Sequence, residues 1–178
     1  TPIRIRSTFN NGEGTLITEG HPAPPVEIRG DKVVTSLAQM ADVAQFVLLS
    51  ESDLNKDGRA LQVFQLLAEA GISVDMIQVS PERISFIVKE DDYEKTLFAL
   101  NRIGLRVDAA KGFAKVAVVG AGMRGVPGVM ARVVYGLSRA GISIFHTTDS
   151  HTNIACLVKR EEMSKALLAL HEEFGLGE

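Results

Sequence analysis

Residues 140–170, AGISIFHTTDSHTNIACLVKREEMSKALLAL, decide the fold, because an earlier stretch of the same chain repeats them. Residues 70–100 read AGISVDMIQVSPERISFIVKEDDYEKTLFAL, and the offset between the two stretches is seventy residues with no gap. Both open on Ala-Gly-Ile-Ser and close on a shared Leu-x-Ala-Leu pattern. Chance does not produce such a match, so the chain contains one structural unit twice.

Each copy shows the same order of hydrophobic periodicities. In the second copy, 115–119 predicts a buried strand, and 142–147 and 154–159 predict two strands joined by a turn. Two helices are predicted from apolar residues three and four positions apart, which are Val126, Val129, Met130, Val133, Val134 and Leu137, then Met163, Ala166, Leu167 and Leu170. Gly141 ends the first of these helices, as a C-cap glycine does. The first copy follows the same β-α-β-β-α order.

The first copy also has a closing strand at 105–109, which completes a β-α-β-β-α-β unit of ferredoxin-like topology. The second copy lacks a closing strand, and the strand-like stretch 31–38 is otherwise unassigned. We therefore predict an α+β protein of two ferredoxin-like βαββαβ units, with the first inserted in the second. The predicted boundaries are 39–111 for the first unit, 31–38 plus 112–178 for the second, and 1–30 for an arm and linker.

The composition excludes several classes of function. The net charge is −3 with acids and bases mixed, so no basic stripe favours nucleic acid. No apolar stretch approaches the roughly 20 residues of a membrane span. The single cysteine, Cys156, excludes an internal disulfide and fits a reducing, cytoplasmic location. Its place in the run IACLV favours a buried, inert thiol over a nucleophile.

The stretch VAVVGAGMRGVPG at 116–128 has the glycine spacing of a dinucleotide-binding fingerprint. A Rossmann helix, however, opens among the glycines, whereas Pro127 best fits the first helical turn, so we expect the helix to start after Gly125. The next strand also turns straight back as a hairpin, where a parallel strand is needed. Dinucleotide binding is therefore disfavoured, and two other interpretations are open, a tight turn with no ligand and a small-anion site at a helix start. The first copy has an equivalent turn, ESDLNKDGRA, at 51–60.

No catalytic or metal-binding constellation is evident. The four histidines have no zinc-like spacing, and Asp149, Ser150 and His151 are adjacent in sequence, unlike a nucleophilic triad. They are interpreted as turn residues or as hydrogen-bond partners of a ligand. No phosphate-binding loop with a lysine is present, so we expect no cofactor in this chain.

The repeat, the glycine turn and the N-terminal arm together resemble the C-terminal regulatory region of aspartate kinase, with its two ACT domains. The resemblance covers essentially the whole chain. It is carried by TPIRIRSTFNNGEGTLIT at 1–18, VVTSLAQMADVAQ at 33–45, GISVDMI at 71–77, VGAGMRGVPGVMARVV at 119–134 and LHEEFGL at 170–176. The family's first ACT unit is likewise inserted in its second.

The resemblance implies an allosteric sensor. It implies that an end-product amino acid binds at domain interfaces and inhibits a kinase that phosphorylates aspartate, and that ATP and Mg²⁺ belong to a catalytic domain that this sequence lacks. The sequence is interpreted as a cut fragment or a separate regulatory subunit. QVSPER at 78–83 and TTDSHTN at 147–153 depart from the lysine- and threonine-sensing pattern. Several segments are more similar to the diaminopimelate-sensing type of Gram-positive bacteria, so meso-diaminopimelate is favoured, with lysine or threonine next.

Matching segments with this family identifies candidate effector contacts. A zwitterion needs backbone donors or an arginine for its carboxylate and an acid for its ammonium group. For Asp75 and Asp149, ordinary capping or turn chemistry is an open alternative. The candidates are Asn55, Lys56, Asp57 and Gly58 in the first turn, Asp75 after it, Met123, Arg124, Gly125 and Val126 in the second turn, and Asp149, Ser150 and His151 on the hairpin.

Open sheet edges favour a homodimer in which two chains pair side by side, and our hypothesis is that the effector locks this dimer. Two alternatives to a sensor remain: a dimerisation module without a ligand, and a nucleotide-binding domain that uses the Gly120–Gly125 loop.

Overall fold

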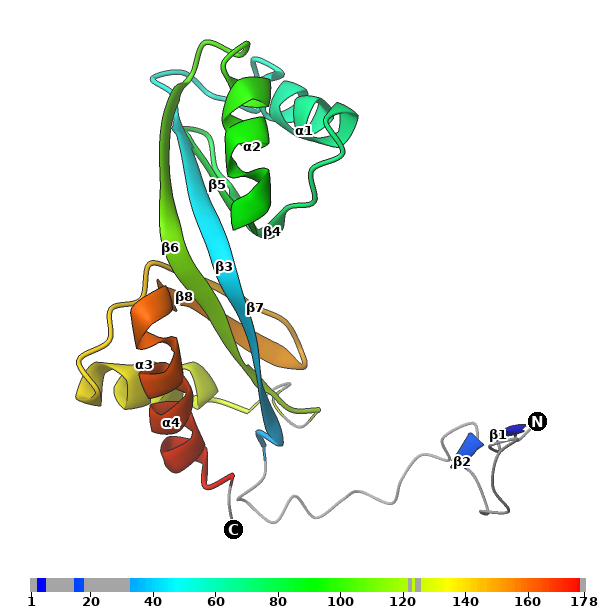
Figure 1. Cartoon of the computed structure of the whole chain (residues 1–178), viewed down its shortest axis with the longest axis vertical. Helices are drawn as coiled ribbons and strands as arrows, with labels where there is room; N and C mark the ends of the chain where they lie inside the picture. Colours follow the sequence, from blue (N-terminus) through cyan, green and yellow to red (C-terminus); the bar gives the residue numbers. More distant parts are fainter. Residues whose placement is uncertain (1–2, 6–14, 18–32, 122, 124–125, 177–178) are drawn as a thin grey trace. The chain divides into compact units, whose positions relative to one another are not determined.

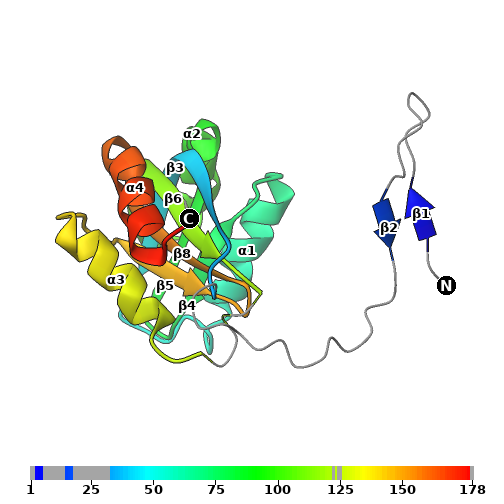
Figure 2. The same cartoon turned by 90° about the horizontal axis from the view of Figure 1, so that it is seen from below.

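The computed structural model describes residues 3–5, 15–17, 33–121, 123 and 126–176. The chain forms two compact parts, Thr1–Gly30 and Asp31–Glu178. In the first part, strands β1 (Ile3–Ile5) and β2 (Thr15–Ile17) pair antiparallel (Figure 2). The sequence predicted only an arm and linker there, and most of that stretch lies outside the described residues.

The second part contains both repeats. The first repeat holds α1 (Arg59–Glu69), β4 (Asp75–Val79), β5 (Arg83–Lys89), the 3₁₀ turn η1 (Glu90–Asp92) and α2 (Tyr93–Leu100). The second holds α3 (Val129–Arg139), β7 (His146–Asp149), β8 (Asn153–Lys159), η2 (Arg160–Glu162) and α4 (Met163–Phe174). The helices and β5 start seventy residues before their counterparts, which confirms the repeat.

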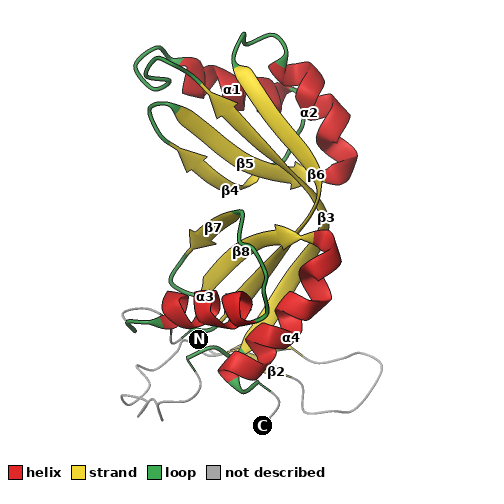
Figure 3. Cartoon of the chain, turned by 90° about the vertical axis from the view of Figure 1, so that its left-hand side faces the viewer, coloured by secondary structure: helices red, strands yellow, loops and turns green. Residues whose placement is uncertain are grey.

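Two long strands, β3 (Ser36–Leu49) and β6 (Arg106–Val119), belong to both repeats (Figure 1). All strands of this part form one antiparallel sheet in the order β4-β5-β3-β6-β8-β7. The end of β3 at 45–49 pairs with 106–110 of β6 in the first repeat, and its start at 36–40 pairs with 115–119 in the second. Each repeat is therefore a four-stranded ferredoxin-like sheet that carries two helices (Figure 3), as the fold class predicted.

The prediction of separate strands on either side of residues 38 and 111 was wrong, because each pair is one continuous strand. The register between β3 and β6 shifts on both sides of Val43, and at these bulges the chain passes from one repeat to the other. Asp42 (φ 54°) and Gly112 (φ 83°), seventy residues apart, take the left-handed conformation at these two points. Arg160 Nη1 lies 2.7 Å from Asp42 Oδ1, and the Gly112 N–H donates to Glu90 Oε2 at 3.4 Å. The two crossings are thus held by equivalent 3₁₀ turns.

The pleat of the strands divides the buried side chains into three clusters. On β8, Ile154, Cys156 and Val158 face α3 and α4, whereas Ala155 and Leu157 face away from the helices. The helix-facing side chains of the first repeat, such as Phe46 and Phe86, form their own core. The third cluster, here called the junction core, draws on both repeats and consists of Val43, Met76, Ile87, Phe113, Ala117, Ala155 and Leu157.

Gly120, the first glycine of the fingerprint-like stretch, is required by packing of the chain against itself. A Cβ atom at this position would lie 2.0 Å from the carbonyl oxygen of Val33 and 2.9 Å from Val34 Cα. The Thr35 N–H donates to Val119 O at 2.8 Å, so the segment that enters β3 is bound directly beside this glycine. The absence of a side chain thus lets β3 approach the end of β6.

We expect Gly120→Ala to reduce the free energy of unfolding by roughly 3 kcal/mol, because backbone atoms must move to admit the methyl group. The measurement is urea unfolding followed by circular dichroism. Ala121→Ser, at the exposed neighbouring position, is the control and should change the free energy by less than about 0.5 kcal/mol. Equal stability of the two variants would contradict the packing explanation.

Candidate functional site

The first strand-to-helix turn uses its own backbone donors. Asp53 Oδ1 accepts from the N–H groups of Asn55 (3.0 Å) and Lys56 (3.3 Å), and the Asp57 N–H donates to Asp53 O at 3.1 Å. Gly58, at φ 70°, caps α1 and donates its N–H to Asn55 O. A ligand carboxylate that used the amides of Asn55 and Lys56 would have to displace the carboxylate of Asp53.

The second strand-to-helix turn is only partly described, and Arg124 and Gly125 lie outside the described residues. The Met123 side chain is 6% exposed and belongs to the core under α3, and Val126 packs against the same core. Pro127 lies in a turn, and α3 begins at Val129 after Gly128 at φ 90°, so the prediction of Pro127 in the first helical turn was wrong. A left-handed residue at 128 delays the helix start.

Asp75, at the start of β4, already has a cationic partner within the chain. Lys115 Nζ lies 2.5 Å from Asp75 Oδ2, and the Met76 N–H donates to Asp75 Oδ1 at 2.7 Å. Burial opposes the charge on Asp75, but these two hydrogen bonds outweigh it and lower the pKa of the carboxyl group. An effector ammonium group at Asp75 would compete with Lys115.

The hairpin residues separate in space. The Ser150 hydroxyl accepts from the N–H groups of Thr152 (3.3 Å) and Asn153 (3.1 Å), which is turn chemistry. His151 is exposed on the same turn. Asp149, the last residue of β7, instead lines a cleft between the two repeats. Of the candidate set, Asp149 is the described residue that this cleft contains.

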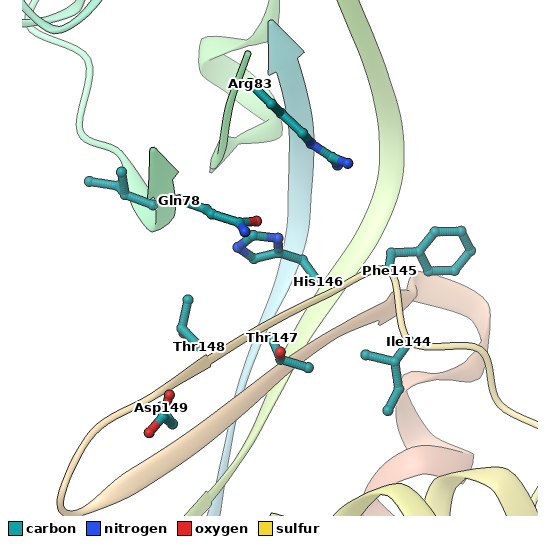
Figure 4. A pocket seen from close by; sticks show the side chains of 9 residues that line it. Gln78, Arg83, Ile144, Phe145, His146, Thr147, Thr148 and Asp149 are labelled. Atoms are coloured by element: carbon teal, nitrogen blue, oxygen red, sulfur yellow. The ribbon is translucent and has the colours of Figure 1, made fainter. Parts of the chain in front are cut away.

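This cleft, here called the junction cleft, has a volume of about 650 Å³ and lies where β4 and β5 of the first repeat approach β7 of the second (Figure 4). Phe145, one of its lining residues, packs edge-on against Phe113 with 5.1 Å between ring centroids, so the cleft adjoins the junction core. The lining residues are Ile77, Gln78, Arg83, Ile144, Phe145, His146, Thr147, Thr148 and Asp149.

His146 is the unusual group of the junction cleft. Its side chain is only 9% exposed, and Nε2 has no hydrogen-bond partner among the described residues. Burial lowers the pKa of the imidazole, the Met76 backbone offsets part of this, and the charge of Arg83 lowers it further. A buried polar atom without a partner is costly, so a ligand atom that bonds Nε2 would recover free energy.

The cleft also places opposite charges and neutral polar groups on one surface. Arg83 comes from β5 of the first repeat and Asp149 from β7 of the second, and Figure 4 shows Gln78 and His146 between them. A guanidinium suits a carboxylate and a carboxylate suits an ammonium group, so this surface can bind a zwitterion. Ile77 and Ile144 add apolar contact.

Sequence reasoning missed Gln78, Arg83 and His146, because nothing local marks them. They lie on different strands, and His146 was considered only as a zinc ligand. The signal that could have found them is the repeat itself, since it predicts that the β4 and β7 edges are equivalent strands. Within the described residues, no three His, Cys, Asp or Glu side chains gather as metal ligands.

Comparison with protein families identifies the class of the fold. Models of the ACT domain match residues 53–103 and 108–172, so this is a tandem ACT-domain chain. None of the described helices combines the length and the apolar character that a membrane crossing requires.

Similar proteins show to which family of ACT-domain proteins this chain belongs. Aspartokinase 1 of Bacillus subtilis (strain 168) is 37% identical over 175 residues, which are 98% of this chain and 43% of that protein. The regulatory subunit of aspartate kinase from Thermus thermophilus, in its ligand-free form, is 33% identical with a TM-score of 0.72, over 80% of this chain and 99% of that one. The chain thus belongs to the regulatory regions of aspartate kinases.

The crystal structure of a further relative contains bound ligands. Escherichia coli aspartokinase III in complex with lysine and aspartate, in the T state, is 25% identical with a TM-score of 0.69, over 99% of this chain and 39% of that one. The chain spans less than half the length of the curated aspartokinases that it matches.

We expect the stability of the chain to fall as the pH is lowered through about 6.5, the usual pKa of histidine. The pKa of His146 is lowered in the folded state, so the unfolded chain binds more protons between the two pKa values. The difference in free energy of unfolding between pH 7.5 and 5.5, from urea titrations, should be smaller in His146→Gln. His151→Gln, at an exposed position, is the control and should behave like the unmodified chain. Equal pH slopes in all three would contradict the assignment.

Proposed function

We propose that this chain is the amino-acid sensor of an aspartate kinase and that the effector binds in the junction cleft. Binding inhibits a catalytic domain that phosphorylates aspartate, and the chain itself carries no catalytic residue. ATP and Mg²⁺ are expected only at that catalytic domain. The effector is an end product of the aspartate-derived pathway, with meso-diaminopimelate favoured and lysine or threonine next.

The observation that carries this proposal is the composition of the junction cleft. Its lining includes a cation of one repeat, Arg83, and an anion of the other, Asp149. It also includes His146, whose Nε2 has no hydrogen-bond partner among the described residues. A ligand that bridges these groups has different contacts whenever the two repeats change their arrangement. Such differential contact is what allosteric coupling requires, because equal binding to both states shifts neither.

The size and polarity of the cleft support the diaminopimelate choice. A volume of about 650 Å³ lies in the range of small-molecule sites and exceeds the need of a small amino acid. Diaminopimelate carries two amino-acid groups, and the polar lining extends along β7 through Thr147, Thr148 and Asp149. Lysine supplies only one carboxylate and threonine is shorter, so each uses fewer of these groups.

A dimerisation module without a ligand is the second candidate, because the β4 and β7 edges carry exposed apolar side chains. Ile77, Val79 and Phe145 are large, apolar and exposed. These edges are also where we propose that two chains pair side by side. The nucleotide-binding alternative is disfavoured, because every strand pair in the described part of the chain is antiparallel and Gly120 packs closely against Val33.

A thermal-shift screen with meso-diaminopimelate, lysine and threonine tests the sensor. A ligand at one hundred times its Kd stabilises the folded state by about 2.7 kcal/mol, which corresponds to a Tm increase of roughly 5–10 °C for a chain of this size. Arg83→Ala and Asp149→Ala should each remove most of the increase, and Arg102→Ala, at an exposed turn, should keep it. A flat screen favours the ligand-free module.

The same screen locates the binding surface. Arg124→Ala and Asp75→Ala are the corresponding variants for the strand-to-helix turn and for the start of β4. The contacts inferred from the sequence predict that each weakens the strongest ligand, whereas binding in the junction cleft predicts that both keep the Tm increase. If these two abolish the Tm increase while Arg83→Ala retains it, the effector binds at the turns and not in the junction cleft.

Pairing of the chains through the β4 and β7 edges is tested by Val79→Lys. A charge on this exposed β4 position should shift the sedimentation profile toward smaller species, because it puts an ammonium group into an apolar contact. Leu61→Lys, on the exposed face of α1, is the matched control and should leave the profile unchanged. A profile that Val79→Lys leaves unchanged would contradict pairing through these edges.

A further inference from the structure

One edge of the sheet lies away from the junction cleft and from the β4 and β7 edges. Residues 106–110 of β6 pair with β3 on one side only, because β8 pairs with β6 from Phe113 onward. Among the described residues, no strand pairs with the other side of this segment, here called the β6 edge. Unpaired N–H and C=O groups in a strand are a template for another strand.

Helix α2 adds an apolar side chain beside the β6 edge. Tyr93 Oη donates to Ala109 O at 3.4 Å, and Glu94 Oε1 lies 3.3 Å from Lys111 Nζ, so α2 flanks this end of β6. Phe98 is four residues after Glu94 and therefore on the same helix face. Its side chain is 76% exposed. A partner strand at the edge would bring its own flanking element against Phe98.

We propose that the β6 edge binds the β6 edge of a second copy of this chain, antiparallel, with Val107 on the two-fold axis. In this register Arg106 of each chain lies opposite Asp108 of the other. Both side chains are exposed and lie on the same sheet face. Opposite charges directly across two antiparallel strands stabilise the pair. The two copies of α2 then flank the new contact, and Phe98 meets its counterpart.

The charges select this register over its neighbours. A two-fold axis at Asp108 places two carboxylates opposite each other, and an axis at Arg106 places two guanidinium groups opposite each other. An axis at Ala109 leaves Arg106 without an opposite charge. Registers shifted by one residue turn helix-facing side chains toward the opposite face. The sequence Arg-Val-Asp is therefore complementary to itself only about Val107.

This contact goes beyond the effector function and does not depend on it. It uses a different edge from the side-by-side pairing at β4 and β7, so the two contacts can exist together and link dimers into larger assemblies. Loss of ligand binding would leave this proposal standing, and loss of the β6 contact would leave the sensor standing.

Cysteine cross-linking of the whole chain tests the register. Directly opposite residues of antiparallel strands have Cα atoms about 4.5–5.5 Å apart, within reach of a disulfide. Val107→Cys should give a disulfide-linked dimer under mild oxidation, read on a non-reducing gel. Ala109→Cys is the matched control, since its two copies would lie roughly 13 Å apart. Cys156 is buried, and burial raises its pKa to about 11, so it should not take part.

Charge reversal in the Val107→Cys background tests whether a second copy of this chain binds the β6 edge. Arg106→Asp alone and Asp108→Arg alone should each lose most of the cross-link, because like charges then face each other. A mixture of the two variants should recover it, since every opposing pair is again complementary. Recovery in the mixture cannot come from the Arg106–Asp108 pair within one chain.

A second measurement covers the case in which the cysteine variants do not fold. Phe98→Lys should reduce the largest species seen by sedimentation of the otherwise unmodified chain, while Leu168→Lys, at the equivalent exposed position of α4, should not. Cross-linking through Ala109→Cys in place of Val107→Cys, no recovery in the mixture, or no effect of Phe98→Lys would each overturn the proposal.

Discussion

The structure depends on the pairing of β3 with β6, because among the strands that the structure describes these are the two that both repeats share. The first repeat contains its four strand segments within residues 45–110, whereas the second repeat is completed by the start of β3 at 36–40. The junction core reinforces this, since Val43 and Ile87 of one repeat pack with Phe113 and Leu157 of the other. Two units joined by a flexible linker would move independently. Two units joined through their strands transmit a change in one to the other.

The two points at which the shared strands pass from one repeat to the other have a distinct backbone conformation. A straight strand of fourteen residues would carry one sheet plane through both repeats, whereas left-handed residues at Asp42 and Gly112 redirect the chain without ending the strand. An aspartate at the first point needs support that a glycine does not, and Arg160 of the second repeat supplies it. At the second point, the N–H of Gly112 instead donates to the carboxylate of Glu90 in the first repeat. Each repeat thus holds the crossing that leads into the other.

Much of this architecture could be predicted from the sequence, and the failures have a physical cause. Periodicity located the helices, the β5 and β8 strands and the upstream strand that closes the second repeat, because the repeat doubled every signal. Polar and small residues around Asp42 and Gly112 resemble strand ends, so periodicity could not reveal continuous strands. The fingerprint-like Gly120 required a tertiary contact, with Val33, to be understood. The junction cleft was missed since its lining comes from distant strands, although Asp149 was among the candidates.

The cleft and the shared strands together define how a ligand would act. His146 lies against the Met76 backbone of the other repeat, and Met76 is itself in the left-handed conformation at φ 48° within the junction core. Nε2 of His146 has no partner among the described residues and Arg83 lies at the same cleft, so a ligand that bonds Nε2 and places a carboxylate near Arg83 would gain free energy. A ligand bound at this point would stabilise one arrangement of β4 against β7. Because we propose that β4 and β7 also pair with a second chain, that arrangement would decide which partner edges fit. Effector binding and subunit pairing would then be two readouts of the same local geometry.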